Sequence, residues 1–140
     1  LNISKEERYY TSFKLKFLFL LSQNHNKNFK KKLKRPYLSD HFIKAEIFEE
    51  GEEYCKLICR KAIKKASFND AINYGKKRIE CLERFPQTDD VQKKIIDART
   101  MLGFSFLQMF HYIESKDAVA PVINLALKHD YKKRLCQLYT

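Results

Sequence analysis

Residues 62–88 read AIKKASFNDAINYGKKRIECLERFPQT, and this stretch decides the fold. Helical spacing runs up to Ala66, a short break follows at Phe68, and a second helical segment continues until Pro86 ends it. The stretch therefore predicts a helical hairpin. Its lysines and arginines, which first resemble a basic recognition element, fall mostly on the solvated side of that hairpin.

The turn of this hairpin has a second copy in the chain. The pattern Phe-x-x-small-x-x-Tyr begins at Phe48 and again at Phe68, with Gly51 and Ala71 as the small residues. We expect the aromatic residue to close a tight turn and the small residue to let the two helices approach closely. Recurrent helix–turn–helix units of this kind build α-solenoids.

The scarcity of turn residues supports an all-α fold. The chain has 140 residues but only three Gly and three Pro, whereas sheet proteins need turn residues often. Ser4 and Glu7 form a capping box at the start of the first predicted helix. Thr88 or Asp89 is a suitable N-cap. The predicted helices cover residues 4–21, 37–48, 50–66, 68–85 and 90–112, followed by one from about Ala120, with Pro121 in its first turn, and one from about Tyr131.

The charge divides the chain into two parts. Of the 28 basic and 17 acidic residues, 10 and 2 respectively lie within residues 1–36, so this segment accounts for most of the net charge of +11. We therefore predict a basic N-terminal helix and loop over 1–36 and a helical repeat domain over 37–140. The chain lacks an initiator Met and stops inside a predicted helix, which indicates a fragment of a longer protein. Apolar surfaces at such ends are expected to favour self-association.

Several segments resemble a known family. The turn at Phe68 resembles that between the paired helices of a tetratricopeptide repeat, and Leu102-Gly103 with Phe106 resembles the repeat's first helix. The run 37–107 resembles the degenerate repeats that follow the ATPase module in large bacterial signalling proteins, which are often fused to cyclase, kinase or transcription-factor domains. The resemblance implies a superhelix of antiparallel helix pairs and a non-catalytic role in protein–protein interaction or intramolecular regulation. The chain departs from the family in having no Trp.

A basic stripe is the candidate partner-binding feature. Lys56, Arg60 and Lys64 recur at i, i+4 and i+8 on one predicted helix. If that helix is the first of a pair, the resemblance places the stripe in the concave groove of the repeats, where it would suit an acidic or C-terminal carboxylate peptide. A solvated helix face explains the same spacing. The opposing helix offers Thr100, Phe104 and Gln108 at comparable positions.

Nucleic-acid binding is the alternative function. The basic run between Phe29 and Pro36 would make electrostatic, salt-dependent contacts with a phosphate backbone. No reading element such as a helix-turn-helix accompanies it. The residues of this alternative are Lys30, Lys31, Lys32, Lys34 and Arg35.

The remaining motifs give no indication of catalysis, metal binding or a membrane span. No Gly-rich phosphate loop is present, so we expect neither enzymatic activity nor a cofactor in this chain. The four cysteines form no CxxC pair and fit a reducing, cytoplasmic compartment. His41 and His111 could join a cysteine only through the fold. The longest apolar run, which ends at Leu21, is too short to cross a bilayer.

Overall fold

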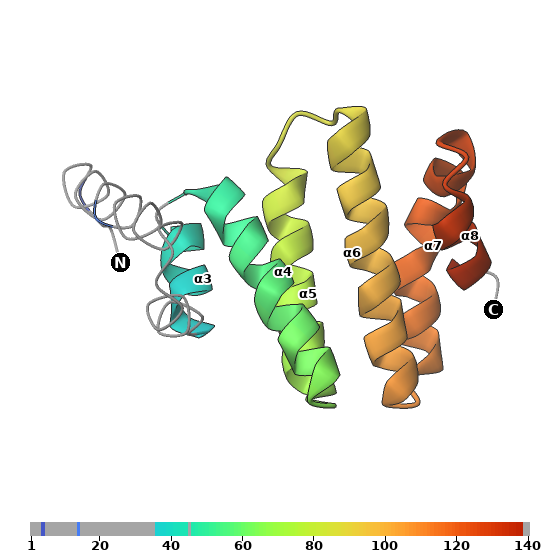
Figure 1. Ribbon diagram of the computed structural model, residues 1–140, viewed down its shortest axis with the longest axis horizontal. Helices are drawn as coiled ribbons and strands as arrows, with labels where there is room; N and C mark the ends of the chain where they lie inside the picture. The colour runs from blue at the N-terminus through green and yellow to red at the C-terminus, as the bar shows by residue number, and fades with distance from the viewer. Residues whose placement is uncertain (1–3, 5–13, 15–35, 45, 139–140) are drawn as a thin grey trace.

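The computed structural model describes residues 4, 14, 36–44 and 46–138, and the helices within these ranges are drawn in Figure 1. They are α3 (Pro36–Lys44), α4 (Phe48–Lys64), α5 (Phe68–Glu83), α6 (Asp89–Gln108), α7 (Tyr112–Lys128) and α8 (Lys132–Leu138). The described residues contain no strand, so the predicted all-α class is confirmed for them. The predicted helix over 4–21 falls outside the described residues, except for Ser4 and Lys14.

One turn geometry connects four of the helix pairs. In the α4–α5 turn, Ala66 has a φ of 55°, the N–H of Ser67 donates to the carbonyl of Ala62, and the N–H of Ala66 donates to the carbonyl of Ile63. These two bonds define a Schellman motif, which satisfies carbonyl groups that the end of a helix leaves unpaired. The same pair of bonds and a positive φ recur at Glu46, Phe110 and Asp130.

These turns correct two predicted helices. The helix predicted over 37–48 ends at Lys44, because the chain turns at Glu46 and Phe48 already begins α4. The helix predicted over 90–112 ends at Gln108 for the same reason, with its turn at Phe110. Both segments look continuous in the sequence, because neither turn contains Gly or Pro.

The start of α7 is a third correction. This helix begins at Tyr112 rather than near Ala120, so Pro121 lies in its interior instead of its first turn. Proline lacks the N–H that would bond to the carbonyl of Asp117. Both residues are exposed, so water can reach this part of the helix. By contrast, Thr88 is an N-cap as predicted, since its Oγ1 accepts a hydrogen bond from the N–H of Val91 at 3.4 Å.

The core is built by successive helix pairs. Residues of α4 and α5 form one apolar cluster around Cys55, Ile58 and Tyr74. A larger cluster joins α5, α6 and α7 around Leu82, Ile96 and other apolar residues. The α4–α5 and α6–α7 turns lie at one end of the pairs, and the α5–α6 connection lies at the other end (Figure 1).

Two glycines test how closely the helices approach. A Cβ at Gly103 of α6 would lie 2.6 Å from Cγ1 of Val119 on α7, whereas a Cβ at Gly75 of α5 would meet nothing closer than 3.4 Å. We therefore expect Gly103→Ala to lower the free energy of unfolding by about 1–3 kcal/mol through overpacking. Gly75→Ala should instead raise it by up to about 1 kcal/mol, because Ala favours the helix more than Gly does.

Denaturant unfolding of the two variants and the parent chain measures both effects. Equal changes in the free energy of unfolding for Gly103→Ala and Gly75→Ala would contradict the close packing of α6 against α7.

Candidate functional site

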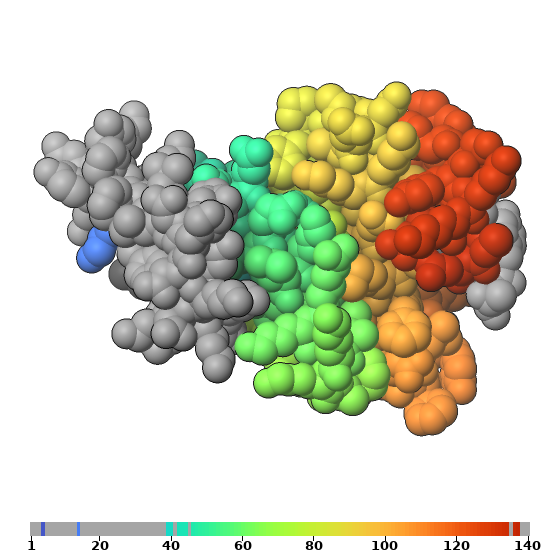
Figure 2. Space-filling model, viewed as in Figure 1, coloured from blue at the N-terminus to red at the C-terminus, as the bar shows by residue number. Residues whose placement is uncertain are grey.

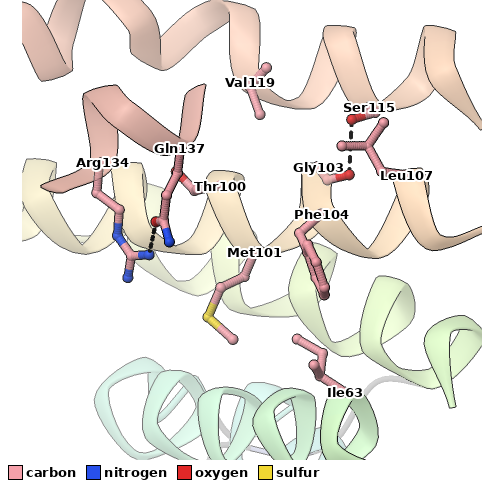
Figure 3. Close-up of a pocket in the computed structure, with 10 residues that line it drawn as sticks. All are labelled: Ile63, Thr100, Met101, Gly103, Phe104, Leu107, Ser115, Val119, Arg134 and Gln137. Atoms are coloured by element: carbon pink, nitrogen blue, oxygen red, sulfur yellow. Dashed lines mark hydrogen bonds between the residues drawn. The ribbon is translucent and has the colours of Figure 1, made fainter. Parts of the chain in front are cut away.

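A pocket of about 480 Å³ lies between α4, α6, α7 and α8 (Figure 3). Ile63 reaches it from α4, and Phe104 and Leu107 reach it from α6. Neither Phe104 nor Leu107 is covered by the fold, since 44% and 45% of their surfaces are exposed. The pocket is therefore mainly apolar and open to an incoming side chain. Its full lining is Ile63, Thr100, Met101, Gly103, Phe104, Leu107, Ser115, Val119, Arg134 and Gln137.

The α6–α7 contact forms one wall of the pocket. Ser115, at the start of α7, donates a hydrogen bond from its Oγ to the carbonyl of Gly103 at 2.9 Å (Figure 3). Because Gly103 carries no side chain, α7 can lie close against α6 there. This contact places Val119 and Ser115 at fixed positions beside the apolar residues of α6.

The wall contributed by α8 is polar and internally paired. Arg134 donates from Nε to Oδ1 of Asp97 on α6, and Tyr131 donates to the same oxygen at 3.2 Å. Arg134 also donates to Oε1 of Gln137, as Figure 3 shows. Because Asp97 balances the charge of Arg134, this edge of the pocket offers a ligand hydrogen-bond donors rather than an unpaired positive charge.

None of the three residues of the predicted basic stripe lines the pocket. Lys56 forms an ion pair with Glu53 at 3.2 Å. Partial burial of Glu53 acts to raise the pKa of its carboxyl group, but the ion pair outweighs this effect, so the pKa is lowered. Arg60 and Lys64 are exposed, and no carboxylate of the described residues lies within ion-pairing distance of either. Ile63, between these two in the chain, is the residue of α4 that lines the pocket.

Two of the three residues predicted on the opposing helix line the pocket, and the third does not. Thr100 and Phe104 line the pocket, whereas Gln108 is exposed at the last residue of α6 and is not part of the lining. Thr100 is buried, and its hydroxyl donates to the carbonyl of Ile96 at 2.7 Å. Phe104 is therefore the one of these three residues that both lines the pocket and is exposed.

A buried ion pair between α4 and α5 was not predicted from the sequence. Arg78 donates from Nε to Oε1 of Glu52 at 2.8 Å, and the two side chains are only 4% and 2% exposed. Lys94 of α6 approaches the second oxygen of Glu52 at 3.9 Å from a half-exposed position. Glu52 therefore links three helices close to the basic stripe.

The cysteines and histidines form no metal site among the residues that the structure describes. Cys55, Cys59 and Cys81 are buried, and Cys136 is exposed. The neighbouring Cys81 thiol and burial raise the pKa of Cys55, and burial raises the pKa of Cys59, so both remain protonated thiols. His111 occupies the N-cap position of α7 without a side-chain capping hydrogen bond, and its ring stacks on Phe106. The side chain of His41 lies outside the described residues.

The residues of the nucleic-acid alternative, Lys30, Lys31, Lys32, Lys34 and Arg35, lie outside the described residues. Within the described ranges, no helix combines the length and the apolar character needed to cross a bilayer.

The buried pair can be tested by removing one partner. Arg78→Met leaves Glu52 buried with only the distant Lys94, and we expect it to lower the free energy of unfolding by about 3 kcal/mol. Lys77→Met on the same helix breaks the more exposed pair with Asp40, and we expect a loss below about 1 kcal/mol. Urea unfolding followed by circular dichroism measures both, and a loss for Arg78→Met no larger than for Lys77→Met would argue against the buried pair.

A comparison of the chain with protein-family models, curated proteins and solved structures found no match. A proposal of function therefore has to rest on the pocket, its polar edge and the exposed side chains around it.

Proposed function

We propose that this chain is a non-catalytic scaffold for protein–protein interaction or intramolecular regulation within a larger signalling protein. In this proposal α4–α5 and α6–α7 are tetratricopeptide-like repeats that stack in a superhelix. The support is the recurring turn, which ends a helix in the same way at Glu46, Ala66, Phe110 and Asp130. Helices α4, α6 and α8 would then be the first helices of successive pairs and would form the concave face.

The pocket between these helices is the observation that carries the proposal. It is mainly apolar, residues of α4, α6 and α8 contribute to its lining (Figure 3), and the exposed Arg60 and Lys64 flank its lining residue Ile63 along α4. These features fit a peptide that places an apolar side chain against Phe104 and acidic side chains near the two cations.

The apolar and basic parts of the site would have different roles. Burial of one Leu-sized side chain against Phe104 and Ile63 contributes about 1.5–3 kcal/mol of binding free energy. Ion pairs at exposed positions such as Arg60 and Lys64 contribute only about 0.2–1 kcal/mol each. The apolar contact would therefore supply most of the affinity, and the cations would select acidic over basic peptides.

Titration with two synthetic peptides tests the proposal. One peptide alternates Leu with Glu, and the other alternates Leu with Lys. We expect the acidic peptide to bind with about tenfold higher affinity and to shift the NMR signals of Met101 and Phe104. Phe104→Ser should weaken its binding about tenfold. Arg60→Gln with Lys64→Gln should reduce the preference for the acidic peptide, whereas the control pair Lys132→Gln with Lys133→Gln, on the exposed face of α8, should not.

Two results would contradict the proposal. One is equal affinity of both peptides for the parent chain. The other is acidic-peptide binding that survives Phe104→Ser unchanged while the variant remains folded by circular dichroism.

A further inference from the structure

The α6–α7 turn exposes more apolar surface than its architecture requires. Phe110, Tyr112 and Ile113 are 75%, 63% and 75% exposed, which is unusual for three large apolar side chains within four consecutive residues. None of the three lines the pocket. We refer to Phe110, Tyr112, Ile113 and the half-exposed Leu107 as the apolar tip.

The other three turns of the chain provide an internal comparison. All four turns share the same hydrogen bonds and a residue with positive φ, so they differ only in their side chains. Phe110 occupies the positive-φ position, and Ile113 occupies the second position of the helix that follows. The equivalent pairs in the other turns are Glu46 with Glu49, Ala66 with Asn69, and Asp130 with Lys133. Large apolar residues at these two positions are therefore not needed to form the turn.

Phe110 also adopts a positive φ, and the burial of its own side chain does little to offset the conformational cost. Its φ is 61°, and this left-handed conformation costs a residue with a Cβ about 1–2 kcal/mol. With three quarters of its surface exposed, Phe110 gains little from burial in return. Its ring contacts mainly Tyr112, at 6.4 Å between centroids, which is itself part of the apolar tip.

Basic side chains outnumber acidic ones at the end of the molecule that carries the apolar tip. The α4–α5 turn lies at the same end of the molecule (Figure 1), and Phe68 after that turn packs edge-on against Phe104 at 6.5 Å. Lys61, Lys64 and Lys65 are exposed there, and none has a carboxylate of the described residues at ion-pairing distance. The acidic residues at this end are Asp70, Glu114 and Asp117, and the basic ones are Arg60, Lys61, Lys64, Lys65 and Lys116.

Among the described residues, the opposite end of the helices has no such excess of basic side chains, because its acidic and basic residues nearly balance. Acidic residues gather there in the first turns of α4 and α6 and the last turns of α5. An anionic surface would therefore attract the end that carries the apolar tip more strongly than the other end. The acidic residues at this end are Glu46, Glu49, Glu50, Glu80, Glu83, Asp89, Asp90 and Asp130, and the basic ones are Lys44, Arg84, Lys93, Lys94, Lys128, Lys132 and Lys133.

We propose that the apolar tip docks on the surface of an anionic lipid bilayer. Phe110 and Ile113 enter the boundary between headgroups and acyl chains, and the Tyr112 ring lies at headgroup level with its hydroxyl in contact with water. The lysines of the α4–α5 turn bind the lipid phosphates and carboxylates. Figure 2 shows the segment around the α6–α7 turn, in orange, projecting from the body of the molecule, which suits entry into a lipid surface.

Vesicle flotation with the full chain tests the proposal. The vesicles contain phosphatidylcholine alone or phosphatidylcholine with phosphatidylserine. We expect binding only to the second kind, and Phe110→Asn with Ile113→Asn should weaken it about tenfold or more. Asn occupies the position of Ile113 in the α4–α5 turn and tolerates positive φ, so this variant should fold at least as stably as the parent chain.

The matched control is Leu127→Asn, which removes a half-exposed apolar side chain near the other end of α7 and should leave binding unchanged. The Phe110→Asn, Ile113→Asn double variant and the Leu127→Asn control have the same net charge, so electrostatic attraction through residues 1–36 is equal in both. Lys61→Gln, Lys64→Gln and Lys65→Gln together should weaken binding more than Lys132→Gln with Lys133→Gln does, per charge removed.

A spectroscopic measurement separates insertion from purely electrostatic adhesion. The chain has no Trp, so Tyr112→Trp and Leu127→Trp each introduce a single reporter. On anionic vesicles the emission of Tyr112→Trp should shift to the blue and be quenched by brominated lipid, and that of Leu127→Trp should not.

Three results would overturn the proposal. The first is unchanged binding of the Phe110→Asn, Ile113→Asn variant. The second is a Trp at position 112 that brominated lipid does not quench in vesicle-bound protein. The third is self-association of the chain, measured by analytical ultracentrifugation without lipid, that the same double variant abolishes. This last result would assign the apolar tip to an interface between two copies of the chain.

Discussion

The architecture depends on the hydrogen bond that closes each Schellman turn. In the α4–α5 turn the N–H of Ser67 reaches back to the carbonyl of Ala62 at 2.9 Å, which is possible because Ala66 adopts a positive φ. The next helix then starts beside the last turn of the previous one, and in α4, α5 and α7 a small residue at the fourth position of the helix allows close approach. The small residues are Gly51, Ala71 and Ser115, and all three are buried.

Ion pairs also join the helices at positions away from the turns. Glu52 and Arg78 join α4 to α5, Glu83 and Arg99 join α5 to α6, and Asp97 and Arg134 join α6 to α8. The last pair spans two helices that are separated in sequence by α7, and Arg134 also lines the pocket. The polar contacts between helices therefore help to shape the surface that we propose for binding.

The sequence predicted the helical class and the α4–α5 hairpin because Phe68 and Ala71 repeat the spacing of Phe48 and Gly51. It did not reveal the α6–α7 turn, since apolar Phe110 in a left-handed conformation looks like the continuation of a helix. Thr100, Phe104 and Gln108 were predicted as positions of the opposing helix comparable to the basic stripe, and of these Thr100 and Phe104 line the pocket while Gln108 does not.

Other features of the site could not be predicted from local patterns. The contact of Arg134 with Asp97 depends on how α8 packs against α6, and sequence spacing does not define that packing. The buried Glu52–Arg78 pair is only weakly indicated by the sequence. Glu52 lies three residues before Cys55 on the buried face of α4, where a charge requires a partner.

Native-state hydrogen exchange of the four turn amides tests most directly whether one repeated turn holds the helix pairs together. The account predicts that the amides of Ile47, Ser67, His111 and Tyr131 exchange far more slowly than in an unstructured peptide, because each donates to a carbonyl five residues earlier. Exchange of these amides at the rate of an unstructured peptide would contradict it.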